Sequence, residues 1–255
     1  MASVFAPSRT AAQGEARFFF IVACLMAAAT MGGFALNLVT GRTSFAMPLL
    51  VHVHALVFMS WIALFLTQTW LVASKNVALH RRLGWLSLLL IPLMVVVGLL
   101  VHRWSMLDHG GPPFIAANEF LFGNPMQLLV FAGLASAAIA LRRDTGWHRR
   151  LLLCAFADIC GAGVGRLVPL PLVIPYAWWV NVGLTLVFPL MGMLADKRRH
   201  GVVHPAWWWG TGTVVAVLIA GEMIAYSAWG LRFTEWYLAG SPGAERPMEA
   251  FPPSM

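Results

Sequence analysis

Residues 50–90 read LVHVHALVFMSWIALFLTQTWLVASKNVALHRRLGWLSLLL, and this stretch decides the fold. It contains a long apolar run, a short basic turn, and the beginning of a second apolar run. An α-helix needs about 20 apolar residues to cross the roughly 30 Å of hydrocarbon in a bilayer. The stretch therefore predicts one membrane-spanning helix, a turn, and the start of the next helix.

One face of the first of these helices carries polar and aromatic residues. The residues that recur at helical spacing on this face are His54, Phe58, Trp61, Phe65 and Gln68. Because they follow the 3.6-residue period, they should line a single stripe. We expect this stripe to face protein rather than lipid.

The composition of the whole chain is that of a multi-pass membrane protein. Of its 255 residues, 60% are hydrophobic and 11% are charged, and the mean hydropathy is +0.76. A soluble domain carries roughly a quarter of charged residues. The net charge of +7 does not indicate nucleic acid here, because most basic residues lie in short turns between apolar runs. We expect them to contact membrane lipids.

Seven apolar segments are long enough to cross a membrane, so we expect an all-α bundle of about seven transmembrane helices. The predicted spans are residues 18–39, 47–74, 84–102, 125–141, 150–168, 177–195 and 206–230. Residues 1–17 would form a cytoplasmic tail, 18–230 the transmembrane domain, and 231–255 an external, partly disordered tail. Cys24, Cys154 and Cys160 all lie inside apolar segments and show no disulfide or metal-binding pattern.

The positions of the basic residues predict the orientation. They follow the even-numbered spans or lie in the N-terminal tail: Arg9, Arg17, Lys75, Arg81, Arg82, Arg142, Arg143, Arg149, Arg150, Lys197, Arg198 and Arg199. By the positive-inside rule this side is cytoplasmic. The N-terminus is then inside and the C-terminus outside.

Charged residues within the spans need a reason, because each costs about 2.5–3.5 kcal/mol to insert at the helix centre. Asp158 falls near the midplane, where it is either a proton-accepting or ion-binding carboxylate or an aspartate that locks two helices. Arg166 and Glu222 fall at similar depth, and we expect them to form an ion pair. Nearby polar residues are consistent with an outward-facing hydrated cavity or with separate interhelical hydrogen bonds.

Histidines gather at the predicted cytoplasmic boundary. His80, His148 and His204 each precede the apolar part of a span, and they either cap helices or share a metal or haem site. His200 and His204 have the i, i+4 spacing at which two imidazoles chelate one metal. With Asp196 they form a candidate metal site, although the basic residues between Asp196 and His200 oppose cation binding.

A set of these residues resembles a group of uncharacterised bacterial multi-pass membrane proteins, which implies a location in the bacterial inner membrane. The residues that carry the resemblance are His54, Trp61, Gln68, LV at 71–72, HRRLG at 80–84, WHRRL at 147–151, Arg166, Asp196 and HPA at 204–206. In addition, LHRRLG at 79–84 is similar to the LHSWLG-type motif of two-haem transmembrane cytochromes b. That resemblance implies haem b, with His80 matching the motif and His54, His102 and His148 as further candidate ligands by position.

Several functions remain open on the sequence alone. The leading hypothesis is a membrane redox protein that binds b-type haem or quinone through helix-end histidines. One alternative is a metal-dependent membrane hydrolase, with zinc as the candidate metal, that uses His200 and His204 and has His80, His148 and Asp196 as further candidate residues. Another is a transporter or channel lined by Asp158, Arg166 and Glu222. A non-catalytic subunit of a membrane complex, or a homo-oligomer, is a further alternative.

Overall fold

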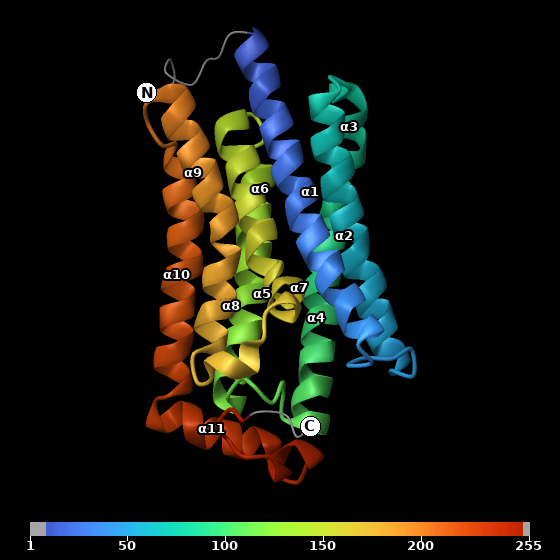
Figure 1. The fold of residues 1–255 in the computed structure, drawn as a ribbon, viewed down its shortest axis with the longest axis vertical. Helices are drawn as coiled ribbons and strands as arrows, with labels where there is room; N and C mark the ends of the chain where they lie inside the picture. Colours follow the sequence, from blue (N-terminus) through green and yellow to red (C-terminus); the bar gives the residue numbers. More distant parts are fainter. Residues whose placement is uncertain (1–8, 252–255) are drawn as a thin grey trace.

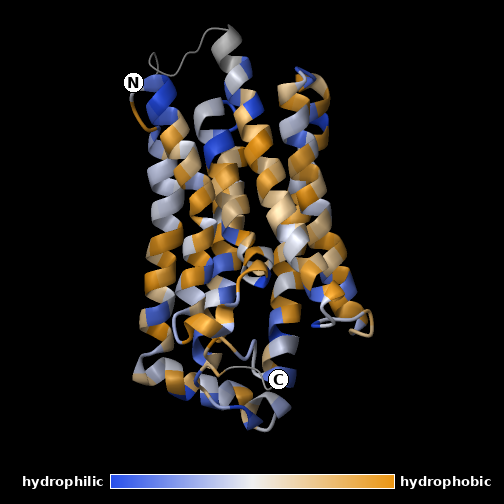
Figure 2. Ribbon diagram, in the orientation of Figure 1, coloured by the Kyte–Doolittle hydropathy of each residue, from blue (hydrophilic) through white to orange (hydrophobic). Residues whose placement is uncertain are grey.

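The computed structural model describes residues 9–251, and this part of the chain forms a helical bundle without a β-strand (Figure 1). Six helical segments are long and apolar enough to cross a membrane, one of them made of two consecutive helices, so the protein is an integral, multi-pass membrane protein. They are α1 (Arg9–Val39), α2 (Leu49–Ala73), α4 (Ser87–His109), α5 (Ala117–Ala140), the pair α8 (Ala177–Thr185) and α9 (Val187–His200), and α10 (Pro205–Ala225). The apolar residues lie along the middle of the bundle and polar residues gather at its two ends (Figure 2).

The predicted fifth span, residues 150–168, is interrupted. The structure forms α6 (Thr145–Ile159) and α7 (Gly161–Leu167) there, and Cys160 separates them. Each piece is shorter than a single crossing requires, which is why this span is absent from the six. The predicted fourth span starts earlier than expected, at Ala117 instead of residue 125, because the helix includes polar residues that the sequence pattern placed in a loop.

Two ends of the bundle have different chemistry. The basic end carries α3 (Val77–Gly84) and the α5–α6 and α9–α10 connections, and it holds Arg81, Arg82, Arg142, Arg143, Lys197, Arg198 and Arg199. At the opposite end, called the α11 end, the helix α11 (Ala228–Leu238) lies across the bundle (Figure 1). Two short 3-10 turns, η2 (Leu170–Val173) and η3 (Pro242–Glu245), complete the fold.

The C-terminal segment, predicted as partly disordered, is folded against the bundle as far as it is described. Arg246 donates hydrogen bonds to the carbonyl oxygens of Gly110 at 2.8 Å and Ile115 at 2.9 Å. The backbone N–H of Ala117 donates to the carbonyl of Met248 at 2.8 Å. The C-terminal segment is therefore held by hydrogen bonds against the loop between α4 and α5. Residues 252–255, also in the predicted tail, lie outside the described residues.

The predicted inward-facing stripe of α2 packs into the core. Trp61 and Phe65 are buried. The ring of Trp61 meets that of Phe131 on α5 edge-on, with centroids 4.9 Å apart, and Phe65 lies 4.7 Å from Phe156 on α6. Large aromatic rings of this kind dominate the energy of a core. This part of the stripe therefore faces protein, as predicted, and it joins α2 to α5 and α6.

Candidate functional site

The sequence HRR occurs at residues 80–82 and again at 148–150, and both copies lie in a helix that begins with a side-chain N-cap. Asn76 caps α3 by accepting a hydrogen bond from Leu79 N–H, and Asp144 caps α6 by accepting one from Gly146 N–H. His80 and His148 each lie four residues after the cap. Both imidazoles therefore project from the first turns of short capped segments at the basic end.

The structure brings His80 and His148 together. Their ring centroids are 6.4 Å apart and the ring planes are at 81°. Burial, and then the neighbouring imidazole of His148, lower the pKa of His80 from its ordinary value. The two rings therefore meet as a largely neutral pair, each half-buried at the edge of the bundle.

Gln68 determines the tautomer of His80. Its side-chain amide faces the carbonyl oxygen of His80 at 3.0 Å and the backbone N–H of Gly84 at 3.0 Å. The carbonyl only accepts and the N–H only donates, so the Gln68 nitrogen points to His80 and its oxygen to Gly84. The same nitrogen donates to Nδ1 of His80. The single hydrogen of the neutral imidazole is then on Nε2.

His148 has the opposite tautomer. Its Nδ1 lies 2.7 Å from the carbonyl oxygen of Ala138, which can only accept. The hydrogen of His148 is therefore on Nδ1, and Nε2 carries a lone pair. The pair thus carries one N–H group, on Nε2 of His80, and one lone pair, on Nε2 of His148.

An apolar groove of about 420 Å³ lies at the lipid-facing side of α2 near the basic end. It lies between α2 and the α3–α4 corner and is lined by Ser60, Ala63, Leu64, Thr67, Leu83, Leu86, Leu89 and Leu90. Gln68 follows Thr67 and Gly84 follows Leu83, so the hydrogen bond between Gln68 and Gly84 borders the groove. Leu86 and Leu89 are exposed, and the groove therefore opens toward the bilayer.

The other two predicted haem ligands do not join the pair. His54 stacks on Phe58 of its own helix, with ring centroids 4.1 Å apart. Nδ1 of His102 lies 3.2 Å from the amide nitrogen of Asn124 on α5. His54 is near the start of α2 and His102 near the end of α4, so both belong to the half of the bundle nearer the α11 end (Figure 1).

The predicted metal residues belong to a buried ion-pair network at the basic end. Arg150 donates to both carboxylate oxygens of Asp196, at 2.7 and 2.8 Å, and to Glu15 at 2.9 Å. Arg149 also pairs with Glu15. Glu15 lies within residues 1–17, predicted as a tail, and only its isolated acidic charge beside an apolar run could have indicated a partner.

Ligand atoms of Glu15, Asp196 and His200 lie within 4.8 Å of one another, which is close enough to hold a metal ion. His204 has a different role, because its Nδ1 accepts from Ala206 N–H at 3.1 Å and so caps α10. Two guanidinium groups already neutralise the two carboxylates of this cluster. A cation would have to displace them, so the network favours a structural role.

The expected ion pair between Arg166 and Glu222 is wrong within the described part of the chain. The guanidinium of Arg166 lies over the ring of Phe34 on α1, 4.3 Å from its centroid, and donates to Ala162 O. Glu222 lies on α10, near Glu119 of α5. The two were predicted from depth alone, and depth does not say which helices are neighbours.

Comparisons with models of protein families, with curated proteins and with solved structures give no match. The resemblances stated from the sequence stay predictions. The function is therefore inferred from the geometry of Gln68, His80 and His148.

Proposed function

We propose that this protein is a membrane redox protein that binds a lipid-soluble quinone at the basic end. The polar head would lie at His80 and His148, and the apolar tail in the adjacent groove. The observation that carries the proposal is the complementary pair of tautomers, which Gln68 and the Ala138 carbonyl determine.

The pair matches both redox states of such a ligand. A quinone carbonyl accepts a hydrogen bond, and Nε2 of His80 can donate one. The hydroxyl of the reduced quinol donates, and Nε2 of His148 can accept that bond or its proton. A small number of convergent polar groups beside an apolar groove is the usual composition of a ligand site.

Haem fits these residues less well. Iron binds the lone pair of an imidazole nitrogen. The hydrogen bond from Gln68 to Nδ1 leaves Nε2 of His80 protonated, so this nitrogen has no lone pair for iron. The other two predicted ligands, His54 and His102, lie away from the pair. We therefore favour quinone over haem b.

Quinone content tests the proposal. The protein is purified in nanodiscs that contain excess quinone, and bound quinone is extracted and quantified against a protein-free nanodisc. We expect binding in the natural sequence and its loss in His148→Ala and Gln68→Leu. His109→Ala, at an exposed histidine near the α11 end, is the matched control and should retain the quinone.

Two results would contradict the proposal. Equal amounts of quinone in the nanodiscs with and without protein would show that the protein does not bind quinone. A Soret band that disappears in His148→Ala would assign the pair to haem instead. Melting temperatures of the variants show whether a loss of binding reflects a loss of folding.

A further inference from the structure

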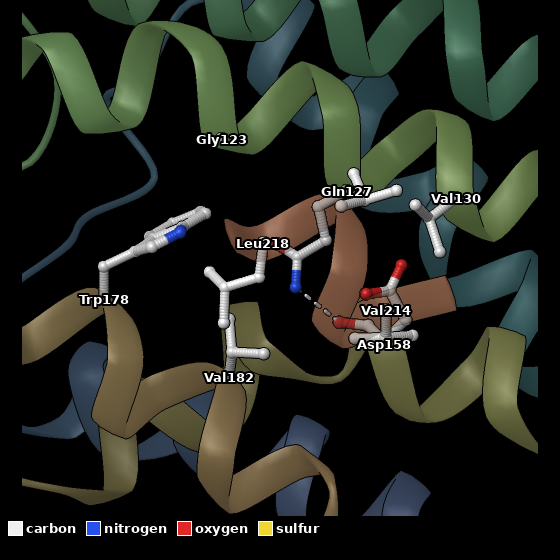
Figure 3. Close-up of a pocket in the computed structure, with 9 residues that line it drawn as sticks. Gly123, Gln127, Val130, Asp158, Trp178, Val182, Val214 and Leu218 are labelled. Carbon is white, nitrogen blue, oxygen red and sulfur yellow. Dashed lines mark hydrogen bonds between the residues drawn. The ribbon is translucent and has the colours of Figure 1, made fainter. Parts of the chain in front are cut away.

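Asp158 lies at the last turn of α6 and is 2% exposed. It lines a cavity of about 20 Å³ that is enclosed by α5, α6, α8 and α10. This volume is sufficient for one water molecule. Figure 3 shows the carboxyl group of Asp158 and the amide of Gln127 facing the same space. Oδ2 of Asp158 is buried and has no hydrogen-bond partner among the residues that the structure describes.

The break in the helix produces a second polar group at this cavity. The backbone carbonyl of Asp158 accepts a hydrogen bond from Nε2 of Gln127 at 2.9 Å. Carbonyl groups in the last turn of a helix lack an intrahelical partner, and Cys160 interrupts the helix two residues later. Helices broken at membrane depth are tolerated where they line a polar cavity, and they commonly mark ion sites.

Among the residues that the structure describes, no counter-charge compensates the Asp158 carboxyl group. The walls from α5, α8 and α10 are Gln127, Val130, Trp178, Val182, Val214, Val217 and Leu218, with no ionisable group. The ionisable groups of its own segment are the thiols of Cys154 and Cys160, and α1 contributes Thr30 beside Cys160. A carboxylate cannot stay charged at low cost in such surroundings, so it must bind a proton or another cation.

Polar groups on α5 lead from this cavity toward the α11 end. Glu119, Gly123 and Gln127 are spaced by four residues and lie on one stripe of the helix. The axial distance from Glu119 to Gln127 is about 12 Å, at 1.5 Å per residue. Gly123 itself lines the cavity. Glu119 is buried, and one of its carboxylate oxygens has no partner among the described residues.

Residues on α10 also run from the cavity toward the α11 end, beside the polar stripe of α5. Leu218 lines the cavity and Glu222 is one turn beyond it. Tyr226, one further turn along, donates a hydrogen bond to Glu119 at 2.7 Å. Two carboxyl groups and a phenol therefore stand between the cavity and the α11 end.

We propose that Asp158 is a proton-binding site, reached by water from the α11 end through Glu119 and Glu222. In the step itself, a hydronium ion transfers its proton to Oδ2, which gives a carboxylic acid and leaves a water molecule in the cavity. The site shares no residue with the quinone site at the basic end. It adds proton uptake to the proposed function and does not depend on it.

Infrared difference spectra between high and low pH test the binding step, on the whole protein in nanodiscs. We expect a carboxylic acid C=O band that shifts in D₂O and is lost in Asp158→Asn. Asp158→Glu should restore a band at a different frequency. An unchanged band in Asp158→Asn, or no acid band at any pH at which the protein is folded, would overturn the proposal.

The rate at which the Asp158 band appears after a pH jump tests the route. Glu119→Gln and Glu222→Gln should slow the rise of the band without removing it. Glu235→Gln is the matched control, because Glu235 is exposed on α11 and away from the cavity. Equal rates in all three variants would show that protons reach Asp158 another way, and the proposed route would be wrong.

Discussion

Arg150 is fully buried and joins α1, α6 and α9 through Glu15 and Asp196. Arg150→Met would leave two buried carboxylates without this partner, and breaking a buried pair costs about 3–5 kcal/mol. We predict a clear fall in the melting temperature in detergent. Arg149→Met is the matched control, since the Arg149 side chain is 26% exposed, and should cost less. Equal losses in the two variants would contradict the central role of Arg150.

His204 gives the network a dependence on pH. Burial, with the nearby guanidinium of Arg150, lowers the pKa of His204 from 6.5 to about 4. The unfolded chain therefore binds a proton before the folded protein does, so His204 contributes stability above pH 6.5 that is lost as pH falls toward 4. His204→Asn keeps a capping side chain without a titrating group. We predict that this variant loses less stability over that interval, measured by melting temperature against pH.

The helices themselves follow from the sequence, while their interruptions do not. Hydropathy places the first residues of α2, α4 and α10 to within three residues, because a long apolar run has few alternatives in a membrane. The early start of α5 was missed, since Asn118 and Glu119 are polar and yet buried in the helix. Their partners, Ala225 and Tyr226, are 107 residues away, and no local pattern indicates such contacts.

The contact between α1 and α7 depends on glycine. A Cβ atom on Gly163 would lie 2.4 Å from Cα of Thr30 and 2.5 Å from its carbonyl oxygen, so the two backbones would have to separate. We predict that Gly163→Ala lowers stability by about 1–3 kcal/mol, the usual cost of overpacking. Gly133→Ala, on α5 with open space around it, should be neutral or stabilising. Thermal unfolding of both variants in detergent would check this, and a stable Gly163→Ala protein would contradict it.

In the whole molecule, the candidate sites are formed by residues from segments that are far apart in the sequence. The predicted ligands His80 and His148 do meet, and each lies near the start of a capped helix. Gln68 was singled out by its helical spacing, but its bond to His80 could not be read from one sequence. Glu15 was missed for the same reason, since its partner Arg150 is 135 residues away. Spacing therefore indicates what lies on one helix, whereas only packing indicates which helices are neighbours.

The two ends of the bundle should face different compartments. His80, His148 and His204 lie at the same end, since His80 contacts His148 and His204 contacts Trp147. The positive-inside rule predicts that this basic end is cytoplasmic. An impermeant maleimide should then label Glu245→Cys in intact bacterial cells, and Arg143→Cys only after the membrane is opened. Both positions are exposed, and the native cysteines lie within apolar helices. Labelling of Arg143→Cys in intact cells would reverse the predicted orientation, and with it the direction from which protons reach Asp158.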